Sequence, residues 1–331
     1  MSAVPVLSTV PRSGTWFLRY TVAFLCHLEQ GGRIDDRLTG RVVGDPAGAP
    51  FDFQRFRGGP LFGIRGVLPV DHLFVGHTVC PGFAHAAADF DWWARTSFHV
   101  PGYDYLHEYA DYRDIGVEVA PYAYAPVDVP AMERSAWEGR GQRIVLVYRN
   151  PLDQATSFFR YCQRHSNPTY HSPGGRPLTD TPFRAYLFES ALPSYAKLFI
   201  SFQAMAKKYP ELVQLVPYER LISKPVDVVT AMLNHFAGAS REWPTLGDAV
   251  SLARSGHMKA VEAELGRSLD GTRMGQHSHM WQGNAGASDD RADGEMRSAA
   301  IARLRDMGVD VDLFEWPAPS EATHERAAVS T

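Results

Sequence analysis

Residues 4–17 read VPVLSTVPRSGTWF, and this stretch decides the fold. An apolar run rich in β-branched residues breaks at Pro11, a short Arg-Ser-Gly-Thr turn follows, and a helical spacing of apolar residues begins at Trp16. This order predicts a buried strand, a tight loop and a helix, which is the first unit of an α/β sheet.

The turn itself has the chemistry of a phosphate-binding loop. Gly14 allows the backbone to approach a ligand closely, and Ser13 and Thr15 offer hydroxyl groups. Thr15 can also cap the helix. The helix N-terminus presents free N–H groups to an anion, and Arg12 adds a positive charge. The loop is not a Walker A loop, because no G-x-x-x-x-G-K-[ST] string occurs in the chain.

Strand and helix patterns alternate along the rest of the chain. Further strands are predicted within residues 67–76, 143–148 and 213–216, and helices over 16–29, from 151 through 159, over 181–208 and 225–236, twice within 240–265, and over 296–307. The alternation predicts one α/β domain, residues 1–316, with a central parallel β-sheet flanked by helices and a P-loop-like strand–loop–helix. Residues 317–331 are predicted to be a disordered tail.

Composition excludes several classes of protein. The 331-residue chain has a formal net charge of −4, so no strongly basic surface indicates nucleic-acid binding. Cys26, Cys80 and Cys162 lack metal-ligand spacing, and their odd number and wide separation favour a reducing compartment. The sequence shows neither a signal-peptide pattern nor an apolar run long enough to span a membrane. We therefore expect a cytoplasmic protein of unknown oligomeric state.

A second anchor follows the most apolar predicted strand, where residues 148–157 read YRNPLDQATS. Ligands of open α/β sheets bind at the carboxyl ends of strands, so Arg149 is placed to reach a bound anion. Its planar guanidinium suits phosphate. Asp153 can bond the free N–H groups of the first helical turn or pair with an arginine. A purely structural ion pair of Arg149 is the alternative.

Both anchors resemble motifs of sulfotransferases that use 3′-phosphoadenosine 5′-phosphosulfate (PAPS). Residues 11–17, PRSGTWF, resemble the family's P-K-S-G-T-T-W loop, which holds the 5′-phosphate end of PAPS, with Arg replacing the usual Lys and Trp-Phe the usual Thr-Trp. Residues 149–157 match R-N-P-x-D-x-x-x-S, whose Arg and Ser bind the 3′-phosphate. The resemblance implies that the following residues bind PAPS: Arg12, Ser13, Gly14, Thr15, Trp16, Phe17, Arg149 and Ser157.

Two further segments resemble the family less closely. Residues 216–221, VPYERL, resemble V-x-Y-E-D-L, whose Tyr lies near adenine; this implies an adenine contact for Tyr218, with a core tyrosine as the alternative. Residues 281–289, WQGNAGASD, are the nearest counterpart of a late R-K-G loop followed by V-G-D-W, and lack its Arg-Lys pair. Gly283 is expected to offer its N–H to the 3′-phosphate from a mobile lid, and the missing charge is expected from Arg273, His277 or His279.

The resemblance also indicates a catalytic base. Residues 73–81, LFVGHTVCP, are similar to the family's F-x-K-x-H-x-P segment, whose His is the base, although the family's Lys is Val75 here. His77 follows the second predicted strand and is therefore expected beside the two anchors. His72, His85, His99 and an acidic residue are the alternatives. Arg12 is expected to stabilise the departing oxygen, because sulfuryl transfer, like phosphoryl transfer, depends on positioning and charge stabilisation.

The resemblance thus implies a sulfotransferase that moves a sulfuryl group from PAPS to a hydroxyl of a small-molecule or glycan acceptor by in-line displacement, without a metal. Two alternatives stay open. One is a non-catalytic nucleotide-binding protein on the same fold, for which the altered late loop leaves room. The other is a P-loop kinase that uses ATP, against which the missing Walker A string counts.

Overall fold

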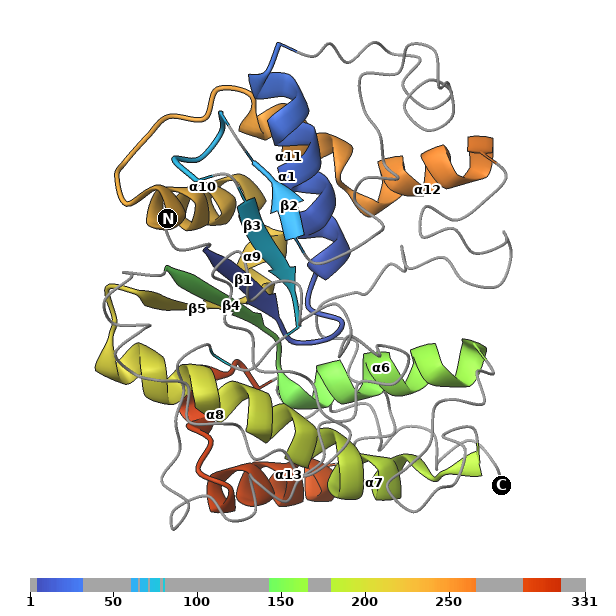
Figure 1. Ribbon diagram of the computed structural model, residues 1–331. Coiled ribbons are helices and arrows are strands. Elements are labelled where there is room, and N and C mark those ends of the chain that lie inside the picture. Colours follow the sequence, from blue (N-terminus) through green and yellow to red (C-terminus); the bar gives the residue numbers. More distant parts are fainter. Residues whose placement is uncertain are drawn as a thin grey trace.

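In the part of the chain that the computed structural model describes, five strands form one sheet in the order β2-β3-β1-β4-β5 (Figure 1). The described residues are 5–31, 61–64, 66–70, 72–77, 80, 143–165, 180–265 and 294–316. The strands are β1 (Val6–Thr9), β2 (Leu61–Gly63), β3 (His72–Gly76), β4 (Ile144–Tyr148) and β5 (Val213–Pro217). β3, β1, β4 and β5 run parallel, which confirms the predicted sheet. β2 adds an antiparallel edge that the sequence pattern did not indicate.

The order of the strands makes β1 a topological switch point. After β1 the chain forms β3 on one side of it and then β4 on the other, both parallel to β1. Ligands of open α/β sheets bind outside the carboxyl ends of the strands at such a point. Thr9 pairs with Val147 and Ser8 pairs with Gly76, so the three strands end at the same edge. The segments that follow β1, β3 and β4 therefore meet there.

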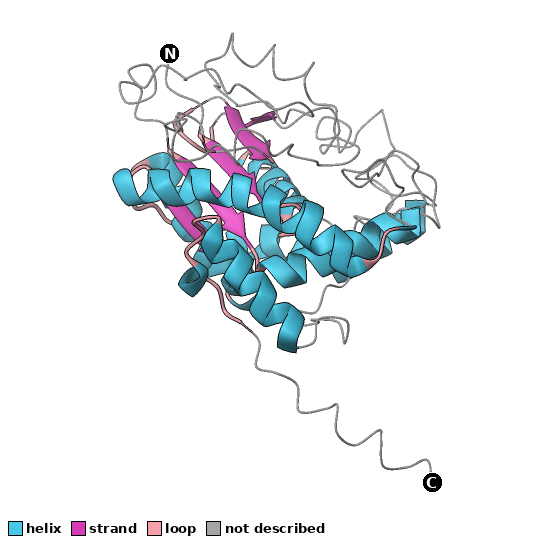
Figure 2. Ribbon diagram, turned by 90° about the horizontal axis from the view of Figure 1, so that it is seen from below, coloured by secondary structure: helices cyan, strands magenta, loops and turns pink. Residues whose placement is uncertain are grey.

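Helices cover both faces of the sheet (Figure 1). β4 is buried throughout: Val145 and Val147 pack toward one helical layer, and Ile144 and Leu146 toward the other. The first layer contains α1 (Thr15–Glu29), α9 (Tyr218–Ser223), α10 (Pro225–Ala237), α11 (Leu246–Leu252) and α12 (Ser255–Leu265). The second contains α6 (Pro151–His165), α7 (Phe183–Tyr186), η4 (Leu187–Ala191), α8 (Leu192–Lys208), α13 (Gly294–Asp306) and η5 (Val311–Leu313). Seen from below, one layer of helices lies in front of the strands (Figure 2).

The helix predicted over residues 181–208 is not a single regular α-helix. It consists of α7, a π-helical segment (η4) and α8. Pro193 lies in the first turn of α8 and has no N–H to donate to the carbonyl of Glu189. A wider π turn accommodates this missing hydrogen bond. None of the described helices has the length and apolar character needed to cross a membrane.

Candidate active site at the carboxyl edge of the sheet

The loop between β1 and α1 turns sharply at the carboxyl edge. Ser13 N donates to Val10 O at 3.1 Å, Arg12 has a φ of 70° and Gly14 has a φ of 86°. Gly14 is the N-cap residue of α1, and no side chain caps this end of the helix. The predicted capping role of Thr15 is therefore wrong: Thr15 is the first helical residue, and its hydroxyl lies 2.6 Å from Thr9 Oγ1.

Two features of this loop fit a phosphate group. Ser13 is fully buried, yet its Oγ has no hydrogen-bond partner among the described residues. A buried hydroxyl without a partner beside free helix N–H groups is suited to a bound anion. In addition, a Cβ on Gly14 would lie 3.1 Å from Tyr218 Cε2 and 3.4 Å from Leu221 Cδ2. Only glycine therefore fits at position 14 without a shift of its neighbours.

The segment after β4 begins α6 with a well-formed cap. Asn150 Oδ1 accepts from Leu152 N at 2.9 Å and from Asp153 N at 3.4 Å, and Pro151 is the first helical residue. Asn150 at the N-cap followed by proline is a favoured start of a helix. Asn150 also donates through its backbone N to Glu219 Oε1 and through Nδ2 to the carbonyl of Glu315. Chain segments far apart in sequence thus fix the start of α6.

Arg149 lies directly beside this cap and is 3% exposed. Its guanidinium carbon lies 5.1 Å from the centre of the Tyr218 ring, and its NH2 lies 3.8 Å from Asp153 Oδ2. The hydroxyl of Tyr195 donates to the carbonyl oxygen of Arg149 at 2.7 Å. Burial between an aromatic ring and a carboxylate holds the guanidinium in one orientation, which suits the recognition of a planar or tetrahedral oxyanion.

Helix α6 also contacts the connection between β1 and α1, whose residues 10–15 we call the phosphate loop. Arg12 Nε donates to Ser157 Oγ at 3.4 Å, and the Arg12 guanidinium lies over the Tyr161 ring at 5.0 Å. Gln154 Nε2 donates to the carbonyl of Pro11 at 3.1 Å. The structure therefore brings together Arg12 and Ser157, which the sequence places 145 residues apart.

His77 follows β3 at the same edge and is 8% exposed. Its Nδ1 lies 2.7 Å from the carbonyl oxygen of Thr9 and 3.1 Å from Thr9 Oγ1. A carbonyl oxygen only accepts, so Nδ1 carries the proton and Nε2 of the neutral ring is the unprotonated nitrogen. Burial lowers the pKa of His77 to about 4, which the hydrogen bond to Thr9 opposes and the Arg19 charge reinforces. The ring is therefore neutral at physiological pH.

The alternative bases differ in position. His72 begins β3, so it lies at the opposite end of that strand, about 16 Å from His77 at the rise of a strand. His85 and His99 lie outside the described residues, as do Gly283, Arg273, His277 and His279. Among the histidines that the structure describes, His77 alone stands at the edge where the phosphate loop and Arg149 meet.

Trp16 and Phe17, unlike the polar residues before them in the motif, pack against the hydrophobic core. Both are half-buried against the α1 side of the core. The Trp16 ring lies 5.7 Å from the Tyr20 ring and 5.1 Å from the Arg19 guanidinium. Arg19 is a buried cation that sequence reasoning missed. Its signal was available, since a residue four positions after Thr15 lies on the same face of a helix.

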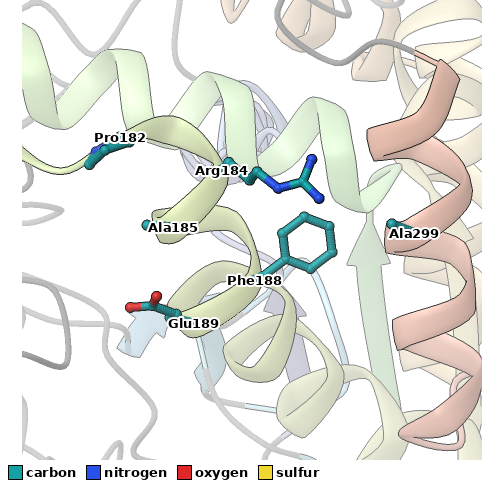
Figure 3. A pocket seen from close by; sticks show the side chains of 6 residues that line it. All are labelled: Pro182, Arg184, Ala185, Phe188, Glu189 and Ala299. Atoms are coloured by element: carbon teal, nitrogen blue, oxygen red, sulfur yellow. The ribbon is translucent and has the colours of Figure 1, made fainter.

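One surface pocket lies apart from these residues. It is lined by Pro182, Arg184, Ala185, Phe188, Glu189 and Ala299, from the α7–η4 segment and α13 (Figure 3). The Arg184 guanidinium lies over the Phe188 ring at 5.5 Å. None of the residues that the sequence singles out lines this pocket, so the candidate site is the carboxyl edge of the sheet.

Similarity to known proteins is found among solved structures, at low sequence identity. No protein-family model matches the sequence, and no curated protein matches it. A mouse sulfotransferase, SULT7A1, complexed with PAP (3′-phosphoadenosine 5′-phosphate) matches with 13% identity and a TM-score of 0.48, over 94% of this chain and 85% of that chain. A retinol dehydratase in complex with androsterone and inactive cofactor PAP matches with 13% identity and a TM-score of 0.46, over 94% and 82%. A retinol dehydratase complexed with retinol and PAP matches with 14% identity and a TM-score of 0.45, over 96% and 84%. A sulfotransferase is among the solved structures to which this chain is similar.

Proposed function

We propose that this protein is a PAPS-dependent sulfotransferase that transfers a sulfuryl group to a hydroxyl of a small-molecule or glycan acceptor by in-line displacement. One observation carries the proposal: two elements that are each suited to an anion, the β1–α1 loop and Arg149, both lie close to one tyrosine. The Tyr218 ring lies 3.1 Å from the point where a Cβ on Gly14 would be, and 5.1 Å from the Arg149 guanidinium carbon. A nucleotide with separate 3′ and 5′ phosphate groups matches two such sites.

The residues at each site suit one end of this ligand. Ser13 Oγ, the hydroxyl of Thr15 and the free N–H groups of α1 would hold the 5′-phosphate. Arg149 and Ser157 would hold the 3′-phosphate, since charge-assisted hydrogen bonds from arginine favour that group. The remaining cofactor contacts that we propose come from Trp16, Phe17, Tyr218 at adenine and the backbone of Gly283.

The chemistry follows from His77 and Arg12. When bound, PAPS supplies a sulfuryl group on a phosphate oxygen, so an O–S bond to the acceptor forms as the S–O bond to phosphate breaks. Nε2 of His77 takes the proton of the attacking hydroxyl, and Nδ1 stays bonded to Thr9 O. Arg12 donates to the departing oxygen. A nearby negative charge favours the protonated form of a histidine, so an occupied phosphate loop raises the pKa of His77 and makes it a better base.

The test is sulfuryl transfer from sulfur-35-labelled PAPS to pools of phenols, aliphatic alcohols and sugars. The wild-type protein is compared with His77→Ala and with His72→Ala, the matched control at the other end of the same strand. We expect His77→Ala to lose about 10²–10⁴-fold in kcat with little change in cofactor affinity. We expect His72→Ala to behave like the wild-type protein.

Other outcomes would identify the alternatives. Tight binding of 3′-phosphoadenosine 5′-phosphate (PAP) without transfer to any acceptor would indicate a nucleotide-binding protein. Magnesium-dependent transfer from ATP, with no transfer from PAPS, would indicate a kinase. Equal turnover of His77→Ala and wild type on an unactivated alcohol would show that the base lies elsewhere.

A further inference from the structure

Thr9, the last residue of β1, joins the phosphate loop to the histidine. Its Oγ1 lies 2.6 Å from Thr15 Oγ1 and 3.1 Å from His77 Nδ1, and its carbonyl oxygen lies 2.7 Å from the same nitrogen. Thr9 is fully buried, so its two contacts with His77 form away from solvent, while its contact with the half-buried Thr15 is partly buried. A third contact of its hydroxyl, to the carbonyl of Gly76, is long at 3.5 Å.

The direction of each hydrogen bond can be worked out from these distances. Nδ1 of His77 must be protonated, because Thr9 O cannot donate. Thr9 Oγ1 can therefore only accept from the ring, and its own hydrogen is left for Thr15 Oγ1 or the more distant Gly76 O. When Thr9 donates to Thr15 Oγ1, the hydrogen of Thr15 is left for a third group. An anion in the phosphate loop is such a group.

We propose that Thr9 is a positioning residue whose hydroxyl couples the phosphate loop to His77, so that an anion bound at Thr15 orients and polarises the base. This inference rests on the proposed function of His77. With an anion present, the bonds along the side chains run in one direction: His77 Nδ1–H, which Thr9 O shares, to Thr9 Oγ1, Thr9 O–H to Thr15, and Thr15 O–H to the anion. Hydrogen bonds aligned in this way strengthen one another, by roughly 10–30% each.

The consequence is a base that responds to cofactor. A stronger bond at Nδ1 increases the electron density of the imidazole and the basicity of Nε2, as a partner on one ring nitrogen sets the behaviour of the other. His77 is then fully activated only when the phosphate loop is occupied. A hydroxyl acceptor that enters before the cofactor meets a weaker base.

The coupling can be measured without ligand or turnover. Nitrogen-15 NMR of the imidazole at neutral pH reports the tautomer and polarisation of His77, with the resonances assigned among the thirteen histidines by a His77→Gln variant. We expect Thr15→Val to move the His77 resonances in the wild-type background and to have no further effect when Thr9→Val is already present. Thr21→Val, which removes a buried hydroxyl of α1 bonded only locally to Phe17 O, is the matched control and should leave them in place.

Thr9→Ser keeps the hydroxyl and should restore both the response to Thr15→Val and the turnover. Thr9→Val should lose about 10- to 100-fold in kcat, the scale expected for a misplaced catalytic group, while its Kd for PAP stays close to that of wild type. If Thr9→Val does not fold, Thr9→Ala takes its place.

Several results would overturn the proposal. One is an equal effect of Thr15→Val on His77 with and without Thr9→Val, and another is equal turnover of Thr9→Val and Thr9→Ser. A wild-type protein that does not bind PAP would refute the proposed function instead. The NMR cycle on the ligand-free protein would still decide whether Thr9 couples Thr15 to His77.

Discussion

Gly14→Ala should damage the fold and the nucleotide site together, for reasons that can be separated. Gly14 has a φ of 86°, where a Cβ costs about 1–2 kcal/mol. The new methyl would also lie 3.1 Å from Tyr218 Cε2, so the ring must move by a few tenths of an ångström. Overpacking of this kind costs about 1–3 kcal/mol. We expect Gly14→Ala to lose about 2–5 kcal/mol in the free energy of unfolding.

Gly308→Ala is the control that isolates the steric part. Gly308 has a φ of 88°, but the nearest atom to its added Cβ is Ile200 Cδ1 at 4.0 Å, an ordinary contact. This variant should therefore carry the backbone cost alone. The difference between the two variants in urea denaturation measures the clash with Tyr218, and the double variant Gly14→Ala/Tyr218→Ala should recover part of it because contacting sites are not additive.

Nucleotide affinity gives the second measurement. The Tyr218 ring also lies against Arg149, so its displacement by Gly14→Ala disturbs both anion-binding elements. We expect the Kd for PAP, measured by calorimetry, to rise by about tenfold or more in Gly14→Ala, which is about 1.4 kcal/mol, and to stay near the wild-type value in Gly308→Ala. If the two variants lose equal stability and bind PAP equally well, the packing of Tyr218 on the loop does not organise the site.

Three further predictions concern the charged groups. Arg149→Met should weaken PAP binding by about one to two orders of magnitude and leave AMP binding unchanged, because a charge-assisted hydrogen bond contributes roughly 1.5–3 kcal/mol. Calorimetry measures both affinities. Arg143→Met is the control, since Arg143 precedes the first residue of β4 and Arg149 follows the last. The pKa of His77 falls from 6.5 to about 4 on folding, so the unfolded state binds more protons between these pH values. The free energy of unfolding should therefore fall by up to about 3 kcal/mol as the pH drops from 6.5 to 4. Denaturation at several pH values should show this loss in wild type and less of it in His77→Gln. Arg12→Ala should reduce both PAPS affinity and kcat, whereas Arg12→Lys should keep much of the turnover; steady-state kinetics that rank the two variants equally would contradict a charge role for Arg12.

Local patterns in the sequence determine the elements that carry the site. The unbroken apolar run of residues 144–148 becomes a strand buried on both faces, and VPVLSTVPRSGTWF becomes β1, the loop and α1. A strand that is buried on both faces has a short-range signal in the sequence, because every one of its positions must be apolar. The signal for the start of α6 is equally local. Asn150 and Pro151, which follow β4, set this helix start through hydrogen bonds that span at most three residues.

What the sequence could not determine is which side chains meet at the edge. Thr9 and His77 are 68 residues apart and Arg12 and Ser157 are 145 apart, and their contacts arise because β3 and β4 pair with opposite sides of β1. Strand pairing of this kind depends on the whole packed sheet, so neither the tautomer of His77 nor the placement of Tyr218 between Gly14 and Arg149 has a local signal. The sequence by itself determined the β1–α1 loop, the start of α6 and the alternation of strands and helices, because each depends on residues close together in the chain. Only the tertiary structure decided how Thr9 links the loop to His77. The burial of Thr9 and its hydrogen bonds to the two residues exist only once the distant strands have packed together.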